Sequence, residues 1–161
     1  MGIIEATTES DCYTALEDLG FKLPNVSPPK GAYIPAVRTG NLVYVSGQIP
    51  MTDGEVIVMG KVGAEVGLDA AINLSRQCAL ASLSAIDHIV GLNNVVQVVK
   101  VLGFVASTRD FARQAEVVNG ASELFVAVFG EAGRHARSSI GVAELPLGAP
   151  VEIEVIVEVA P

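Results

Sequence analysis

The residues best suited to chemistry lie near the C-terminal end of the chain, where Arg137 and Glu152 stand in two strand-like segments. Arginine is the side chain that best holds a planar carboxylate, because its fork of N–H groups donates two parallel hydrogen bonds. Ser139 and Gly141 follow Arg137 at alternate positions and leave room beside it. Glu152 on the neighbouring strand would face the same space. The pattern predicts a pocket for a small carboxylic acid.

The two segments that carry these residues are predicted to be strands joined by a Leu-Pro-Leu-Gly-Ala-Pro turn. In the second, over residues 151–159, Glu152, Glu154 and Glu158 share one face. The opposite face is wholly apolar, since residues of one face recur at every second position of a strand. Its members are Ile153, Val155, Val157 and Val159.

The rest of the chain alternates between strand and helix patterns. A helix over 7–19 and an extended connector over 25–30 are predicted first, followed by a hairpin of strands 33–37 and 42–46 and a short hairpin at Asp53-Gly54. Helices over 68–90 and 110–129 flank a strand over 95–107, whose continuous apolar run indicates a buried central strand. The order ββ-α-β-α-ββ predicts an α+β fold with one sheet and two main helices on one face. The whole chain, 1–161, is predicted to be one domain, with 1–30 as an N-terminal helical extension and connector.

The composition limits the possible partners. Half of the 161 residues are hydrophobic and only 17% are charged, which favours an oligomer that hides further surface. The net charge of −8, with scattered basic residues, argues against nucleic acid as a partner. No apolar run is long enough for a bilayer, and the acidic N-terminus lacks a signal pattern, so we expect a cytoplasmic protein. Cys12 and Cys78 have no metal-ligand or redox spacing, and no metal or cofactor is predicted.

Five pieces of the sequence, taken in order, resemble the Rid family of reactive-intermediate deaminases, also called the YjgF family. They are Gly-Ala-Tyr-Ile-Pro-Ala-Val at 31–37, Val-Tyr-Val-Ser-Gly-Gln-Ile-Pro at 43–50, Arg-Asp-Phe at 109–111, Val-Asn at 118–119 with Glu123, and Ala-Arg-Ser at 136–138 continuing to Glu-Ile-Glu at 152–154. The resemblance implies a chorismate-mutase-like fold and a homotrimer with clefts between subunits. It also implies metal-free hydrolysis of imines and enamines to keto acids and ammonia.

The resemblance also assigns roles to single residues. It implies that Arg137 grips the substrate carboxylate and that Glu152 is associated with the attacking water. The remaining positions would bind substrate around them; they are Tyr33, Ser46, Gly47, Asn119 and Ser139, the last standing where cysteine is frequent in the family. The N-terminal extension, extra residues within 111–117 and Gly133-Arg134-His135 before the Ala-Arg-Ser motif indicate a divergent subgroup.

His135 has two interpretations. It stands two residues before Arg137, so an extended chain would place both on one face and give the site a further donor or proton carrier. The other interpretation, which the position of His135 just before a predicted strand favours, is a loop histidine at the strand entrance.

Three functions remain open at this point. The first is hydrolytic deamination of small 2-imino or enamino acids. The second is non-catalytic binding of small carboxylates through the same arginine. The third is endoribonuclease activity, which the acidic charge disfavours.

Overall fold

The C-terminal strand β7 (Val151–Val159) lies at the centre of the fold in the computed structural model, which describes residues 11–26, 28–29 and 31–161. It is the middle strand of a five-stranded sheet in the order β1-β2-β7-β5-β6. The other strands are β1 (Ala36–Thr39), β2 (Leu42–Gln48), β5 (Val95–Ala106) and β6 (Ala136–Val142). All neighbours are antiparallel except β5 and β6, which are parallel.

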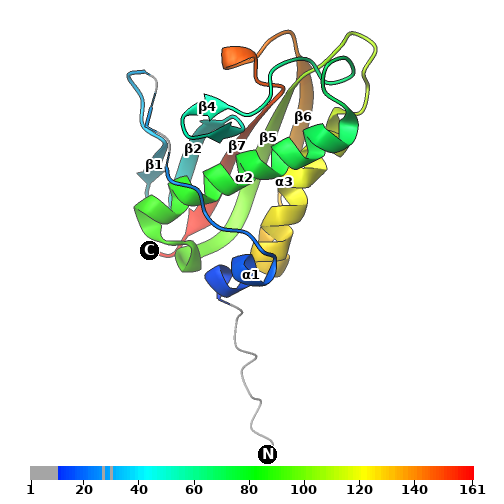
Figure 1. The fold of residues 1–161 in the computed structure, drawn as a ribbon. Helices are drawn as coiled ribbons and strands as arrows, with labels where there is room; N and C mark the ends of the chain where they lie inside the picture. The colour runs from blue at the N-terminus through cyan, green and yellow to red at the C-terminus, as the bar shows by residue number, and fades with distance from the viewer. Residues whose placement is uncertain (1–10, 27, 30) are drawn as a thin grey trace, which may run out of the picture.

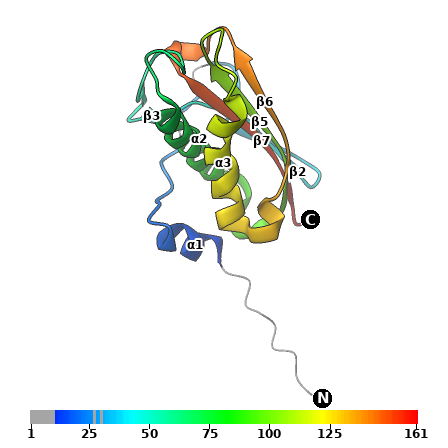
Figure 2. The ribbon, with the colours of Figure 1, turned by 90° about the vertical axis from the view of Figure 1, so that its right-hand side faces the viewer.

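Two long helices cover one face of this sheet, α2 (Leu68–Val90) and α3 (Gln114–Phe129), as Figures 1 and 2 show. The predicted α+β fold is therefore confirmed. The bounds of α2 match the prediction, with Gly91 at its end in a conformation of positive φ that favours glycine. Helix α3 begins at residue 114 rather than 110, because Phe111 N–H closes a turn onto Thr108 O before the helix starts.

The smaller elements frame these layers. The hairpin of β3 (Met51–Thr52) and β4 (Glu55–Val56) turns at Asp53-Gly54, as predicted, and both turn residues have positive φ. Helix α1 (Cys12–Asp18) is the described part of the helix predicted over 7–19; residues 7–10 of that prediction lie outside the described residues. Three short 3₁₀ turns complete the chain, η1 (Leu92–Asn94), η2 (Gly130–Gly133) and η3 (Pro146–Gly148).

The arrangement of the last two strands differs from the prediction. We expected β6 and β7 to be neighbours, but β5 lies between them and β6 forms an edge of the sheet. The reason is that β5, α3 and β6 make a parallel crossover. Helix α3 carries the chain back to the end of the sheet where β5 begins, so β6 runs beside β5 in the same direction. Residues 143–150 then lead over β5 to the strand beyond it.

The faces of β6 also differ from the prediction. Ser139 was expected on the face away from the helices, together with Glu152. Ser139 instead pairs with Gly103 of β5, and a side chain at Gly103 would run into Val118 of α3. Ser139 therefore lies on the helix-covered face, whereas Glu152 lies on the open one.

The open face of the sheet is only partly polar. Its exposed apolar side chains include Val37, Tyr44 and Ile140, whose register places them on the face away from α2 and α3. The strand predicted over 95–107 as central and buried does lie inside the sheet, as β5 between β7 and β6, but its burial is incomplete in the single chain, where Val96 and Val99 are exposed. Among the described residues, no helix combines the length and the hydrophobicity needed to cross a membrane.

The contact between α2 and α3 yields a test of this packing. A Cβ atom at Gly120 would overlap the backbone carbonyl of Ile72, which cannot swing away as a side chain can. Alanine normally favours a helix over glycine by about 1 kcal/mol. We nevertheless expect Gly120→Ala to lower the free energy of unfolding by about 1–3 kcal/mol, since the helices must move apart. Urea denaturation measures this. Gly67→Ala, which meets open space, is the control and should cost less than about 1 kcal/mol.

Candidate functional site

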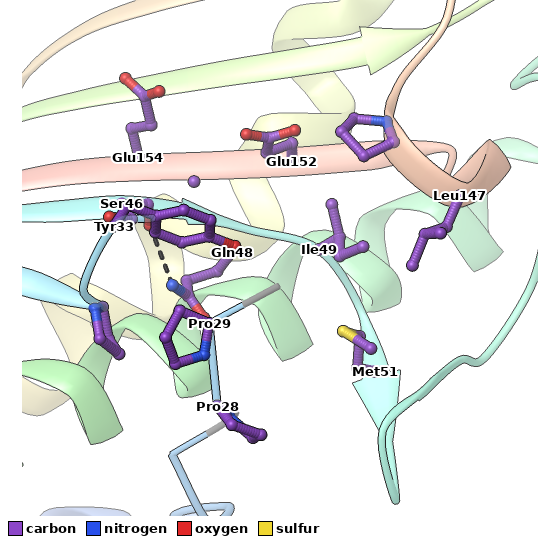
Figure 3. Close-up of a pocket in the computed structure, with 13 residues that line it drawn as sticks. Pro28, Pro29, Tyr33, Ser46, Gln48, Ile49, Met51, Leu147, Glu152 and Glu154 are labelled. Carbon is purple, nitrogen blue, oxygen red and sulfur yellow. Dashed lines mark hydrogen bonds between the residues drawn. The ribbon is translucent and has the colours of Figure 1, made fainter. Parts of the chain in front are cut away.

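A pocket of about 490 Å³ opens beside β2 and β7, on the face of the sheet away from the helices. Four of the predicted site residues line it, namely Tyr33, Ser46, Gly47 and Glu152. Figure 3 shows Glu152 and Glu154 projecting from β7, with Tyr33 lying beside Ser46. The remaining wall is largely apolar; it includes Pro28, Pro29, Pro35, Ile49, Met51, Pro146 and Leu147. The pocket thus combines carboxylates with a surface suited to carbon chains.

An irregularity in β2 shapes this pocket. The register between β2 and β7 shifts between Val45 and Gln48, so Ser46 and Gly47 form a bulge opposite the start of β7. A Cβ atom at Gly47 would overlap the Glu152 carboxylate. Glycine at this position therefore allows the Glu152 side chain to lie directly against the backbone of the neighbouring strand.

Hydrogen bonds hold the bulge in place. The Ser46 hydroxyl donates to Ile34 O at 2.7 Å, and Gln48 Nε2 donates to Ser46 O at 2.9 Å. The Ser46 hydroxyl proton is thus spent within the chain, so this residue supports the pocket wall rather than donating to a ligand. Tyr33 is 52% exposed and presents its ring to the pocket.

The acid–base character of Glu152 is altered by its surroundings. Burial raises the pKa of the Glu152 carboxyl, because an ionised group loses hydration there, and the negative charge of Glu154 raises it further. A carboxyl group with a raised pKa is better matched to exchanging protons near neutral pH. Glu152 therefore suits proton transfer more than an ordinary surface glutamate does.

Arg137 lies in a separate place, on the helix-covered face of β6. Its Nη1 donates to Asn119 Oδ1 at 2.9 Å and to Ser122 Oγ at 3.0 Å, and its Nη2 donates to Ala115 O at 3.2 Å. All three acceptors are neutral groups of α3. No ion pair found among the described residues includes Arg137, unlike Arg76, Arg113 and Arg134.

The hydrogen bonds of Arg137 leave part of its fork unused. A guanidinium has five N–H donors, and three are spent on α3 among the described residues. Two N–H groups remain, which is the number that a carboxylate accepts in a bidentate pair. The arrangement is that of a half-buried cation fixed by neutral partners, with donors left for one carboxylate.

The residues predicted to lie around Arg137 differ in where the structure places them. Asn119 contacts it directly. Ser139 lies on the same face of β6, and its hydroxyl is buried without a hydrogen-bond partner among the described residues. His135 does not point into an open cleft, because its Nε2 lies 2.9 Å from Ser122 Oγ and its Nδ1 2.6 Å from Gly133 O.

The predicted site residues thus form two groups. Tyr33, Ser46, Gly47 and Glu152 lie together on the open face; Arg137, Asn119, His135 and Ser139 lie together between β6 and α3. Strand β5 and the sheet itself separate the groups. Within one chain, Arg137 and Glu152 do not face the same space, contrary to the prediction.

Sequence reasoning missed Ser122, which contacts both Arg137 and His135. The signal was present, because Ser122 follows Asn119 by three residues and therefore lies on the same side of a helix. Glu154 was likewise not recognised as part of the pocket. Among the described residues, no group of three or more His, Cys, Asp or Glu side chains is placed to hold a metal ion.

Comparison with known proteins agrees with this fold and these motifs. The sequence model of the family described as Endoribonuclease L-PSP matches residues 24–159. The chain belongs to the Rid (YjgF) family. Protein TCP17 of Trypanosoma cruzi is 42% identical over 145 residues, covering 89% of this chain and 91% of that protein.

Two further proteins that resemble the chain are a solved structure and a relative with a named activity. The crystal structure of protein Atu1372 from Agrobacterium tumefaciens has a TM-score of 0.85 at 42% identity, covering 94% of this chain and 93% of that one. The 2-iminobutanoate/2-iminopropanoate deaminase of Escherichia coli strain K12 is 36% identical over 126 residues, covering 78% of this chain and 86% of that protein.

The raised pKa of Glu152 predicts a pH-dependent gain in stability on its replacement. Folding disfavours the ionised carboxylate, so Glu152 lowers stability at pH values above the ordinary carboxyl pKa of 4.5. Glu152→Gln keeps the shape without the charge. We expect it to raise the free energy of unfolding at about pH 7.5, with the gain shrinking as the pH falls towards 4.5. Urea denaturation across this range, with Glu158→Gln on the same strand as control, measures the effect. A gain that grows on acidification would contradict it.

Proposed function

We propose that this protein hydrolyses small 2-imino acids and their enamine tautomers to 2-keto acids and ammonia. The observation that carries the proposal is the state of Arg137, a half-buried arginine held by three neutral acceptors with two N–H groups to spare. A 2-imino acid presents a carboxylate next to its reactive carbon, so a bidentate contact to the carboxylate also fixes that carbon. The relative named 2-iminobutanoate/2-iminopropanoate deaminase supports this substrate class.

Glu152 is proposed to move the protons. The substrate carbon is electrophilic once its nitrogen is protonated, and a water molecule adds to it. Glu152 accepts a proton from that water as the C–O bond forms, and then gives a proton to the nitrogen of the carbinolamine. The C–N bond breaks with its electron pair leaving on ammonia. As the carbonyl forms, the second proton of the original water passes to the Glu152 carboxylate and from it to the ammonia, which leaves as ammonium. A raised pKa suits a group that must accept and return a proton.

The two groups of site residues are proposed to meet in a homotrimer, with Arg137 of one copy facing the pocket of the next. Arg137 lies on β6 at the sheet edge, and the open face bears exposed Val37, Tyr44 and Ile140. An exposed apolar sheet face of this kind is normally covered in a stable protein. The contact would bring a cation to a pocket that has carboxylates of its own.

Two other functions are less well supported. A non-catalytic carboxylate binder would use Arg137 in the same way but has no need for Glu152. Endoribonuclease activity, the word in the family's description, requires the binding of a polyanion. The net charge of −8 and the carboxylates of Glu152 and Glu154 in the pocket oppose that binding.

Arg137 provides the main test of the proposed function. Arg137→Ala removes a charge-assisted pair from a partly buried site, which typically costs roughly 2–5 kcal/mol. We expect roughly a thirty-fold to several-thousand-fold loss in kcat/KM for ammonia release from 2-iminobutanoate generated in situ. Arg137→Lys should restore only part of it, because an ammonium cannot reproduce the fork. Arg134→Ala, which removes an exposed arginine paired with Glu131, is the control.

Turnover measured together with ligand binding distinguishes an enzyme from a binder. Glu152→Gln should leave binding of 2-oxobutanoate nearly unchanged in calorimetry while it slows turnover. Binding that depends on Arg137 without any turnover by the native protein would make the binder the better account. If neither quantity depends on Arg137, the proposed pocket is wrong.

Assembly is tested by sedimentation equilibrium. We expect a mass three times the 16.7 kDa of one chain at micromolar concentration. Ile140 is 47% exposed on the open face, and Ile140→Asp should shift the protein towards monomers, because it places a charge where an apolar contact is proposed. Val126→Asp, on the exposed side of α3, is a control that should leave the mass unchanged. A native protein that sediments as a monomer would overturn the trimer.

A further inference from the structure

A continuous line of hydrogen bonds runs from the backbone at Gly133 to the guanidinium of Arg137. His135 Nδ1 lies 2.6 Å from Gly133 O, and His135 Nε2 lies 2.9 Å from Ser122 Oγ. Arg137 Nη1 then donates to the same Ser122 oxygen at 3.0 Å. Two side chains, Ser122 and His135, therefore stand in line behind Nη1 of the arginine.

The chemistry of these groups fixes the direction of each bond. A backbone carbonyl only accepts, so His135 Nδ1 must carry a proton to bond with Gly133 O. In the neutral ring Nε2 is then an acceptor, and the Ser122 hydroxyl donates to it. The lone pairs of the Ser122 oxygen are thereby turned to Arg137. Burial lowers the pKa of His135; the Gly133 bond raises it and the charge of Arg137 lowers it again, so the balance favours the neutral ring.

The supports of this line are rigid. Ser122 stands one helical turn after Asn119 on α3, so both acceptors of Arg137 Nη1 come from one face of a long helix. The His135 ring meets the ring of fully buried Phe125 edge to face, with centroids 5.9 Å apart and an interplanar angle of 89°. His135 is thereby held by the core ring of Phe125 and by the backbone carbonyl of Gly133.

We propose that Ser122 and His135 are positioning residues, which orient the Arg137 guanidinium for the substrate carboxylate without touching the substrate themselves. The proposal rests on the carboxylate-binding role of Arg137 given under the proposed function. It assigns His135 an indirect role in place of the direct substrate contact predicted from the sequence. His135 orients the Ser122 hydroxyl, and Ser122 together with Asn119 fixes the rotation of the guanidinium plane.

The physical need for such support follows from the arginine side chain. Arginine has several rotatable bonds, and holding its fork in one orientation costs conformational entropy that a binding partner must otherwise supply. Loss of the Ser122 acceptor leaves one Nη1 proton without its partner, so that only Asn119 and Ala115 hold the fork and its orientation is less fixed. Carboxylate binding should weaken while the chemical step, which depends on Glu152, changes less. The expected signature is a rise in KM with a nearly constant kcat.

The positioning role is tested with matched variants of the whole chain, in the assembly in which it is purified. Ser122→Ala removes the acceptor, and His135→Phe keeps an aromatic ring against Phe125 but cannot accept a bond. We expect each to weaken 2-oxobutanoate binding in calorimetry, and to raise KM for 2-iminobutanoate, by about three- to ten-fold. His135→Gln, whose side-chain oxygen can accept from Ser122, should stay within about two-fold of the native protein.

Non-additivity gives the sharper readout. If His135 acts only through Ser122, adding His135→Phe to Ser122→Ala should cause less than about a two-fold further loss. Ser82→Ala is the control for removing a buried helix serine, since Ser82 Oγ bonds only Cys78 O within its own helix among the described contacts. It should leave 2-oxobutanoate binding unchanged. Multiplying losses in the double variant would overturn the inference.

The outcomes separate this inference from the proposed function. If Arg137→Ala abolishes 2-oxobutanoate binding but Ser122→Ala and His135→Phe bind as the native protein does, the positioning role is wrong and the proposed function stands. If Arg137→Ala itself changes nothing, the proposed function fails. Should the variants fold poorly, ¹⁵N NMR of the histidines in the native protein decides: His135 is expected with its proton on Nδ1, and a proton on Nε2 would overturn the inference.

Discussion

The alternation of side chains along β6 and β7 is the constraint on which the rest of the structure depends. Every second residue of β7, from Val151 to Val159, is buried against the helices, so Glu152 must lie on the other face. Arg137 pairs in register with buried Val101 and therefore faces α3. A shift of β7 by one residue would reverse its faces and drive its glutamates into the core, and a shift of β6 would turn Arg137 away from α3. The sheet thus keeps the two charged groups apart within one chain.

This separation has an electrostatic consequence. An arginine and a glutamate that met directly would form an ion pair, which would occupy the fork of Arg137 and lower the pKa of Glu152. The fold instead gives Arg137 three neutral acceptors, and leaves Glu152 beside another carboxylate, Glu154. Within one chain, Arg137 is therefore left without an ion pair on one face of the sheet, and Glu152 keeps a raised pKa on the other.

The sequence predicted the bounds of the helices and strands better than it predicted which strands lie side by side. Helix α2 was predicted to the residue, because its apolar stripe ends at a glycine, and the faces of β7 followed from strict alternation. Periodicity tells which residues of a strand share a face. It does not tell whether that face is turned towards the helices or away from them, or which strand is the neighbour. Ser139 was therefore placed on the wrong side, and β5 between β6 and β7 was missed.

The candidate site shows the same division between local and distant information. Gly47 was predicted to belong to the site, yet the group that lies directly against it, Glu152, is more than a hundred residues away in the sequence. The contact of His135 with Ser122 joins a loop to a helix and leaves no pattern in either segment. Such contacts depend on how α3 lies against β6, which no local rule supplies.

The support given to Glu152 bears on whether the chain is a catalyst or only a binder. Binding a small carboxylate requires Arg137 and its acceptors, but it has no need for Glu152. A glutamate that is desolvated and lies beside Glu154 also lowers the stability of the folded chain. Its position further requires glycine on the neighbouring strand, where any side chain would displace it. These features carry a cost without benefit in a pure binder, whereas a hydrolase that moves protons to and from water has a use for each of them.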